Sequence, residues 1–225
     1  MHTDEPNAMT SKPLAAGIGA LAFGAMTLAA MFISDAPGGN YTSAQVAGYV
    51  SRGERASQLL AFFLAMCAIP GLIYLLAHVR DALAASPEHR RAASLVWGSG
   101  IAAAACFAIG WGVDGGQVLA HLEGGSAIVI PPAVTYLISE IGVMFVFGCG
   151  AMLLGFALVT LMVSSRGLMP NWLRRLTLVF GLCGIAGLAW ATFFVLLLGT
   201  AVIGAWLIAA GRTQASHELA VEART

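Results

Sequence analysis

Long apolar stretches, separated by short clusters of charged and turn-forming residues, make up most of this chain. A helix rises about 1.5 Å per residue and the hydrocarbon core of a bilayer is about 30 Å thick, so a span needs roughly 20 mostly apolar residues. Because backbone amides in lipid must bond within their own segment, we interpret the stretches as helices. Five of them qualify: Leu14–Ser34, Ser57–His78, Ala92–Gly112, Ala133–Val163 and Leu173–Gly211.

The last stretch is too long for one span, because a single helix over Leu173–Gly211 would measure about 55–60 Å. Its middle, from Gly187 to Thr192, combines glycine, tryptophan and threonine and favours a tight turn. We therefore predict an all-α fold, a polytopic six-helix transmembrane bundle with a terminal helical hairpin. The predicted membrane domain covers 14–211, with tails at 1–13 and 212–225 and spans at about 14–34, 57–78, 92–112, 133–163, 173–189 and 193–211.

The basic residues favour six spans over five, with both termini in the cytoplasm, because cytoplasmic loops are enriched in Lys and Arg. Six spans place nine basic residues inside and only Arg52 and Arg55 outside, whereas five spans give seven and four. The nine inner residues are Lys12, Arg80, Arg90, Arg91, Arg166, Arg174, Arg175, Arg212 and Arg224.

Two arginine pairs, Arg90 with Arg91 and Arg174 with Arg175, are expected to lie among lipid headgroups at the inner face. Their ordinary role there is to fix the topology, and a specific site for an anionic lipid is the alternative at the first pair. The lipid bilayer is thus the one partner that the sequence predicts directly.

A short outer amphipathic helix is predicted between the first two spans. Thr42 and Ser43 can cap it, and its apolar residues Val46, Tyr49 and Val50 share one face over 44–51. We expect this helix to lie on the outer surface or to cap the bundle.

The composition agrees with a membrane protein: charged residues make up 10% of the chain, against about 25% in soluble domains. Lys12 is the single lysine, which is typical of a GC-rich bacterial genome, so we expect a bacterial inner membrane protein without a nucleic-acid partner. The four cysteines fall in predicted spans without CxxC or metal-type spacing. No GxSxG, HExxH or P-loop motif occurs, so no cofactor is expected and a non-enzymatic role is favoured.

Glu140 is the one charged residue inside a predicted span and away from its end. An intramembrane carboxylate is a functional hypothesis by default, for ligand or proton handling. Glu140 lies 26 residues before Arg166, or about 39 Å along a helix, so it is expected near the outer interface. A structural hydrogen bond to a neighbouring helix is the alternative.

A second candidate site lies in the predicted outer loop 113–132, which holds Asp114, His121 and Glu123. Histidine and carboxylates are plausible ligands of a divalent metal, and His121 and Glu123 can converge if the backbone is extended. The spacing matches no established zinc pattern. Together with Glu140, the three residues would form an outer acidic pocket.

Three segments resemble a group of uncharacterised six-span membrane proteins of high-GC bacteria. They are the stretch Thr42–Val50 before the second span, the exit Leu76–Leu83 and the opening Gly167–Leu173 of the terminal hairpin. The resemblance implies the six-span fold and carries no activity, cofactor or catalytic residue.

The leading functional hypothesis is therefore a small scaffold or accessory protein that binds a lipid, a small ligand or a partner helix at its outer end. A membrane-protein partner or a homo-oligomer is possible in that case. The first alternative is a small proton-coupled transporter or permease that uses Glu140. The second is an intramembrane enzyme with an outer metal site.

Overall fold

The computed structural model describes residues 12–34, 42–49, 55–124, 130–166, 168–187 and 190–222, and every regular element in these ranges is helical. The predicted tail at 1–13, the loop residue Arg52 and Val50 of the predicted outer helix fall wholly or largely outside these ranges. The elements are α1 (Lys12–Ile33), α2 (Ser43–Tyr49), α3 (Arg55–Ala84), the 3-10 turn η1 (Pro87–His89), α4 (Arg90–Gly124), α5 (Pro132–Val143), the π-helix η3 (Met144–Gly150), α6 (Ala151–Ser164), α7 (Asn171–Ile185) and α8 (Trp190–Glu222).

Five helical segments in the described part of the chain are long and apolar enough to cross a membrane, as a multi-pass membrane protein requires. They are Pro13–Ile33, Arg55–Ala84, Pro87–Gly124, Pro132–Ser164 and Ala191–Thr213. Helix α7 has 15 residues and is therefore only about 22 Å long, too short to qualify. The break predicted near Gly187 is confirmed between Ile185 and Trp190, whereas the sixth span stays a prediction.

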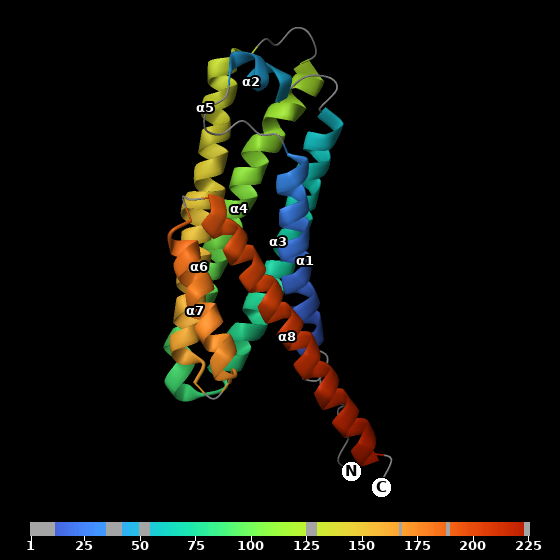
Figure 1. Ribbon diagram of the computed structural model, residues 1–225, viewed down its shortest axis with the longest axis vertical. Helices are drawn as coiled ribbons and strands as arrows, with labels where there is room; N and C mark the ends of the chain where they lie inside the picture. Colours follow the sequence, from blue (N-terminus) through green and yellow to red (C-terminus); the bar gives the residue numbers. More distant parts are fainter. Residues whose placement is uncertain are drawn as a thin grey trace, which may run out of the picture.

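The long helices α1, α3 and α4 and the continuous rod of α5, η3 and α6 run along the long axis of the molecule (Figure 1). Helix α8 crosses obliquely, packs against α1 and forms a hairpin with α7. Helix α2 lies across one end, next to α5, and we call this the α2 end. The opposite end, formed by the end of α3, η1, the start of α4 and the α6–α7 connection, carries most arginines and is called the arginine end.

Helix α4 is longer than the sequence predicts, because it continues past Gly112 to Gly124 instead of entering a loop. Glycines weaken an isolated helix, but packing against neighbouring helices overrides this preference. The Phe62 ring of α3 packs directly against Gly115, where a Cβ on residue 115 would lie 2.6 Å from two ring carbons. Together with α5 and the start of α3, this part of α4 projects beyond the α7–α8 turn towards the α2 end (Figure 1).

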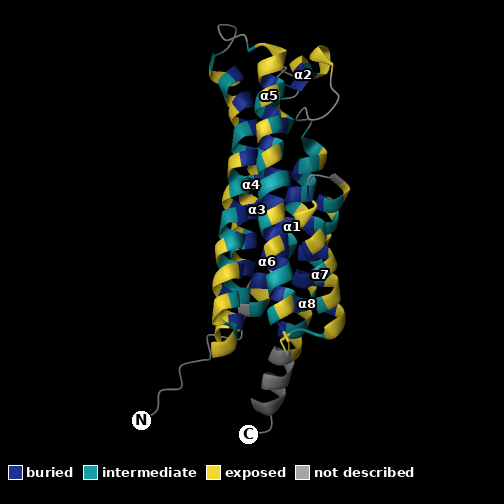
Figure 2. Cartoon of the chain, turned by 90° about the vertical axis from the view of Figure 1, so that its left-hand side faces the viewer, coloured by how far each residue is buried: buried dark blue, intermediate teal, exposed yellow. Residues whose placement is uncertain are grey.

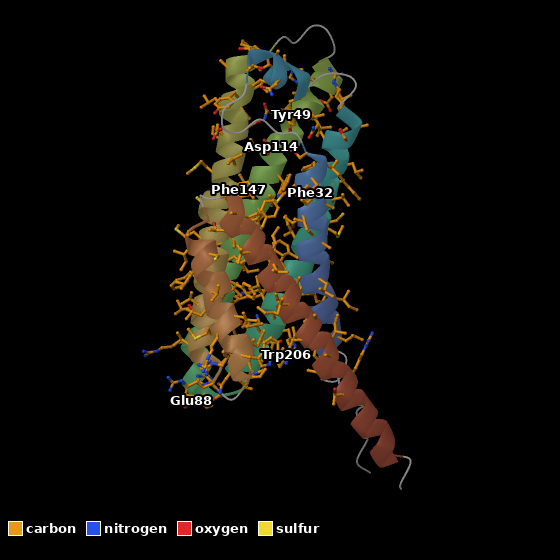
Figure 3. The ribbon with its side chains drawn as sticks, in the orientation of Figure 1. Phe32, Tyr49, Glu88, Asp114, Phe147 and Trp206 are labelled. Atoms are coloured by element: carbon orange, nitrogen blue, oxygen red, sulfur yellow. The ribbon has the colours of Figure 1, made fainter. Side chains whose placement is uncertain are left out.

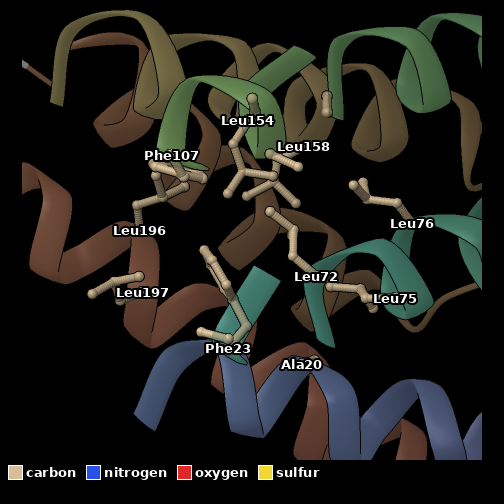
Figure 4. Close-up of a cluster of buried hydrophobic side chains, with 14 of the residues drawn as sticks. Ala20, Phe23, Leu72, Leu75, Leu76, Phe107, Leu154, Leu158, Leu196 and Leu197 are labelled. Carbon is tan, nitrogen blue, oxygen red and sulfur yellow. The ribbon is translucent and has the colours of Figure 1, made fainter. Parts of the chain in front are cut away.

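The core between the long helices is made mainly of alanines, leucines and an aromatic cluster (Figure 4). The Phe193 ring centroid lies 4.6 Å from that of Phe147 and 6.1 Å from that of Phe107, and Phe107 continues to Phe23 at 5.7 Å. Exposed residues lie on the outward faces of the helices, where a bundle in a bilayer meets lipid (Figure 2).

Small residues allow the closest helix contacts. A Cβ on Gly155 of α6 would lie 2.5 Å from the carbonyl oxygen of Gly181 on α7, so these two backbones touch. In the same way, a Cβ on Gly17 of α1 would lie 2.7 Å from the carbonyl oxygen of Gly204 on α8. The hairpin of α7 and α8 is therefore held against α6 and α1 by close backbone packing, as is typical of helices in membranes.

Candidate functional site

Buried polar side chains gather at the α2 end. They come from four helices that meet there, and they are Tyr49 of α2, Gln58 of α3, Asp114, Gln117 and His121 of α4, and Thr135 and Ser139 of α5. Buried hydroxyls nearer the arginine end differ, because Ser165, Thr177 and Thr200 each donate to a carbonyl oxygen of the preceding turn. At the α2 end, by contrast, Tyr49 bonds to α4 and Gln117 of α4 bonds to Ser139 of α5, so some of the polar groups join different helices.

Asp114 is the charged member of this cluster, and its residue is only 7% exposed. Carboxyl oxygen Oδ1 is buried and has no hydrogen-bond partner among the described residues. Gly142 of α5 makes room for the carboxyl group, because a Cβ there would lie 3.0 Å from Oδ1 and 3.1 Å from Oδ2. The Ser139 hydroxyl also interacts with this carboxyl group.

Tyr49 ties α2 to the site. Its hydroxyl donates a hydrogen bond of 3.3 Å to the backbone carbonyl oxygen of Asp114 (Figure 3). Burial raises the pKa of Tyr49 far above its ordinary value, and the nearby Asp114 charge raises it further. The hydroxyl therefore stays a neutral donor, and it leaves the Asp114 carboxyl group without a bond from α2.

Gln117 and Ser139 join α4 to α5, because the Gln117 amide nitrogen donates to the Ser139 Oγ at 3.0 Å. Gln117 Oε1 is buried without a partner among the described residues. His121 Nδ1 lies 2.8 Å from the Gln117 carbonyl oxygen, so Nδ1 carries the proton and Nε2 is an acceptor in the neutral ring. Two acceptors of the cluster, Asp114 Oδ1 and Gln117 Oε1, are thus buried without a partner among the described residues.

A cavity of about 40 Å³ adjoins the Asp114 side chain on the side of the bundle core. A cavity needs about 10–15 Å³ to hold one water molecule, so this one has room for a few. Its lining is apolar except for Asp114 and Ser34, and consists of Met31, Ser34, Trp111, Asp114, Val143, Val146 and Phe147.

The π-helix η3 forms one wall of the cavity through Val146 and Phe147. π-helical turns are rare and occur mostly at functional sites, because the wider turn changes the direction of side chains without ending the helix. Here the wide turn lies next to the one buried carboxyl group of the described chain. The π-helix and the buried Asp114 carboxyl group therefore adjoin the same cavity.

The structure places two of the predicted metal ligands on one face of α4, two turns apart, and the third on another face. Asp114 and His121 are seven residues apart on α4 and both buried, whereas Glu123 is exposed. The predicted convergence of His121 and Glu123 needs an extended backbone, and both residues are helical. No group of three His, Cys, Asp or Glu side chains suited to a metal occurs in the described part of the chain.

Glu140 lies half-buried on α5, one residue after Ser139. One residue turns a helix by about 100°, so Ser139 faces the cluster and Glu140 points to a different side. Sequence reasoning named Asp114 and His121 but missed Tyr49, Gln117 and Ser139. The signal for Gln117 was its i+3 spacing from Asp114, which is meaningful only once α4 extends beyond Gly112.

The predicted headgroup arginines lie at the arginine end. Arg90, Arg91 and Arg175 are exposed. Arg174 differs, because its Nε and Nη2 donate to the Met162 carbonyl oxygen at 3.2 and 3.1 Å, so its guanidinium group is held against the end of α6.

No protein-family model, curated protein or solved structure matches this chain. The resemblance to six-span bacterial membrane proteins therefore stays a prediction, and the function is argued from the geometry of the site.

Proposed function

We propose that this chain is a multi-pass membrane protein that handles protons through Asp114, as a small proton-coupled transporter or permease. The observation that carries this proposal is the buried Asp114 Oδ1, which has no hydrogen-bond donor among the described residues and adjoins a cavity large enough for water. Polar groups buried without a partner are rare, and each such group asks for an explanation.

A buried carboxyl group without a full set of donors carries a large desolvation cost in its charged form. Gln117 Oε1 adds a second buried acceptor without a partner among the described residues of the same cluster. A proton on the carboxyl group turns one acceptor into a donor and relieves this cost. The cavity can supply that proton through water, which bridges polar groups almost as well as direct contact.

Asp114 takes the role that the sequence suggested for Glu140, because Asp114 is the more buried of the two carboxylates. Intramembrane ionisable residues that face the bundle interior mark proton relays in pumps and transporters. Both its burial and the adjoining π-helix support Asp114 in this role.

We further propose that the protein lies in a bacterial inner membrane with its arginine end in the cytoplasm, since cytoplasmic loops are rich in arginine. Both termini would then be cytoplasmic, and α2 would lie at the outer face as the amphipathic helix at the mouth of the site. In this arrangement α7 and α8 together form the last two of six spans, with α7 short enough to require local thinning of the bilayer.

Proton movement into reconstituted vesicles tests the proposal. Vesicles with a pH-sensitive dye inside and an imposed membrane potential should change internal pH faster with the protein than without it. Asp114→Asn, which keeps the shape and removes the charge, should reduce the rate to that of empty vesicles. Glu140→Gln is the matched control and should keep most of the rate.

Equal rates for the unaltered protein and Asp114→Asn would contradict the role of Asp114. A rate no greater than that of empty vesicles would contradict proton movement itself.

A scaffold or accessory protein is the second candidate, and helix α7 favours it. This short helix contacts mainly α6 and α8, and it leaves Leu176, Val179 and Leu182 exposed on its outer side. A partner helix or a second copy of the chain can cover such a face through close packing. Co-purification of a partner that is lost in Val179→Arg and kept in Asp114→Asn would favour this candidate over the transporter.

A further inference from the structure

A second, larger cavity lies near the arginine end, between α3, α6, α8 and the connection from α6 to α7. Its volume is about 130 Å³. Ser165 and His78 are its polar members, and the complete lining is His78, Val79, Ala82, Leu83, Leu161, Ser165, Leu168, Met169, Ile203, Trp206 and Leu207. Trp206 lies towards the arginine end, at which Glu88 is found (Figure 3).

The size and lining of this cavity suit an apolar chain. An apolar cavity of about 150 Å³ inside a soluble protein stays dry and binds benzene, so a cavity of 130 Å³ takes an apolar group of several carbons. The Trp206 side chain, with its apolar rings and polar N–H, is typical of the depth at which lipid chains meet their headgroups.

A fixed positive charge lies beside the wall of this cavity. The Met162 carbonyl oxygen accepts hydrogen bonds from Nε and Nη2 of Arg174, at 3.2 and 3.1 Å, and it also accepts from the Ser165 hydroxyl at 3.4 Å. Ser165 lines the cavity, so the guanidinium group of Arg174 is held next to it. The described bonds use one N–H of each Arg174 nitrogen, the third going to Asn171 Oδ1 at 3.5 Å.

Two further N–H groups of the Arg174 guanidinium remain for another acceptor. The neighbouring residue after Ser165 is Arg166, which is exposed. An apolar chain that enters the cavity would therefore place an anionic group on the same molecule within reach of two cations.

We propose that this cavity is a binding site for an anionic phospholipid, with a segment of one acyl chain in the cavity and the phosphate held by Arg174 and Arg166. Charge complementarity determines this choice of occupant, because guanidinium groups bind phosphate oxygens through paired hydrogen bonds. A neutral apolar molecule would fill the cavity and leave both cations unused. The site is separate from Asp114 and does not depend on the proposed proton movement.

Thermal stability of the purified protein in detergent, with added phosphatidylglycerol or phosphatidylcholine of identical acyl chains, tests the site. A ligand that binds only the folded state raises its melting temperature. Phosphatidylglycerol should raise the melting temperature of the unaltered protein, and phosphatidylcholine should raise it much less. Native mass spectrometry should show one phosphatidylglycerol retained per chain.

Two matched pairs of variants test separately the binding of the acyl chain in the cavity and the attraction of the phosphate to Arg174. Ala82→Phe fills the cavity and should remove the response, whereas Ala84→Phe, which is also exposed on α3 but does not line the cavity, should keep it. Arg174→Gln should weaken phosphatidylglycerol binding about fivefold, the effect of one basic residue near an anionic lipid, and Arg175→Gln should weaken it less. Arg174→Lys keeps the charge without the paired bonds to Met162 and should retain the preference for phosphatidylglycerol.

An equal response to both lipids would overturn the site, because ordinary contact with surrounding lipid would then explain it. An undiminished rise in melting temperature with phosphatidylglycerol in Ala82→Phe would show that the acyl chain binds elsewhere. Equal loss in Arg174→Gln and Arg175→Gln would show diffuse attraction to the arginine end instead of a site. The Ala82 pair and the Arg174→Lys variant keep the test decisive if Arg174→Gln fails to fold.

Discussion

The Tyr49 hydroxyl donates a 3.3 Å hydrogen bond to the backbone carbonyl oxygen of Asp114, across 65 positions of sequence. This bond links the short helix α2 to the helix that carries the buried carboxyl group. It goes to the backbone and not to the side chain, so the Asp114 carboxyl group keeps an oxygen without a donor among the described residues. Helix α2 therefore covers the site without neutralising it.

Replacement of Tyr49 by Phe should loosen α2 while the bundle stays folded. The variant removes one buried hydrogen bond, worth about 0.5–1.5 kcal/mol, and retains the apolar ring. Hydrogen–deuterium exchange should become faster in 43–49 and remain unchanged in the core of α4. Tyr74→Phe is the control, because Tyr74 is exposed on α3. Unchanged exchange in 43–49 would show that the hydroxyl does not hold α2 in place.

Alkaline pH should destabilise the protein through Tyr49. Burial, and then the Asp114 charge, raise the pKa of this tyrosine in the folded state, so the folded protein keeps the proton at a pH where an unfolded tyrosine loses it, above about 10. The resulting stabilisation is complete below that pH and decreases as the pH rises further. The melting temperature should therefore fall more steeply above about pH 10 in the unaltered protein than in Tyr49→Phe. Parallel curves would contradict the burial of this hydroxyl.

Gly142→Ala should disturb the site directly. Its methyl group would lie 3.0 Å from Asp114 Oδ1 and 3.0 Å from the Gly110 carbonyl oxygen, so either α5 or the carboxyl group must move. Overpacking of this kind costs about 1–3 kcal/mol. Gly116→Ala is the control, since nothing lies within 4 Å of its added methyl group, and it should be neutral or stabilising by up to about 1 kcal/mol. Comparison of the two melting temperatures checks this, and equal values would contradict the tight packing at Gly142.

Phe193→Ala should destabilise the bundle far more than Phe194→Ala. Phe193 is fully buried between Phe107 and Phe147, whereas Phe194 is 36% exposed and contacts Phe32 near the surface. Removal of a buried phenyl ring leaves a cavity and costs about 3–5 kcal/mol. Unfolding of both variants in mixed detergent micelles measures the difference, and similar losses would place the core elsewhere.

The apolar pattern predicts the helices well because backbone bonding in lipid leaves few alternatives. The helical stretches and the break near Gly187 both follow from it. Val46 and Tyr49 of α2 are buried, whereas the place of α2 at an outer membrane face stays a prediction. The end of α4 does not follow from the apolar pattern. Gly115 and Gly116 are typical of a loop, and only the packing of the Phe62 ring against Gly115 explains the helix there. Propensity alone cannot include that contact.

The same limit explains the candidate site. Asp114 and His121 are visible in the sequence as chemically capable residues, but their burial depends on α5 and α2 covering α4. Glu140 has the more conspicuous position inside an apolar stretch, yet Ser139 is the fully buried residue. The rotation of α5 about its own axis determines whether Ser139 or Glu140 faces the bundle interior, and no pattern in α5 alone determines that rotation.

The central claim is that the Asp114 carboxyl group gains and loses a proton, and infrared spectroscopy tests it most directly. The carbonyl stretch of a protonated carboxylic acid is distinct from the bands of a carboxylate, so difference spectra between acidic and alkaline samples report each titrating group. The account predicts a carboxylic-acid band that disappears on alkalinisation, is absent in Asp114→Asn and persists in Glu140→Gln. A spectrum of Asp114→Asn identical to that of the unaltered protein at every pH would contradict it.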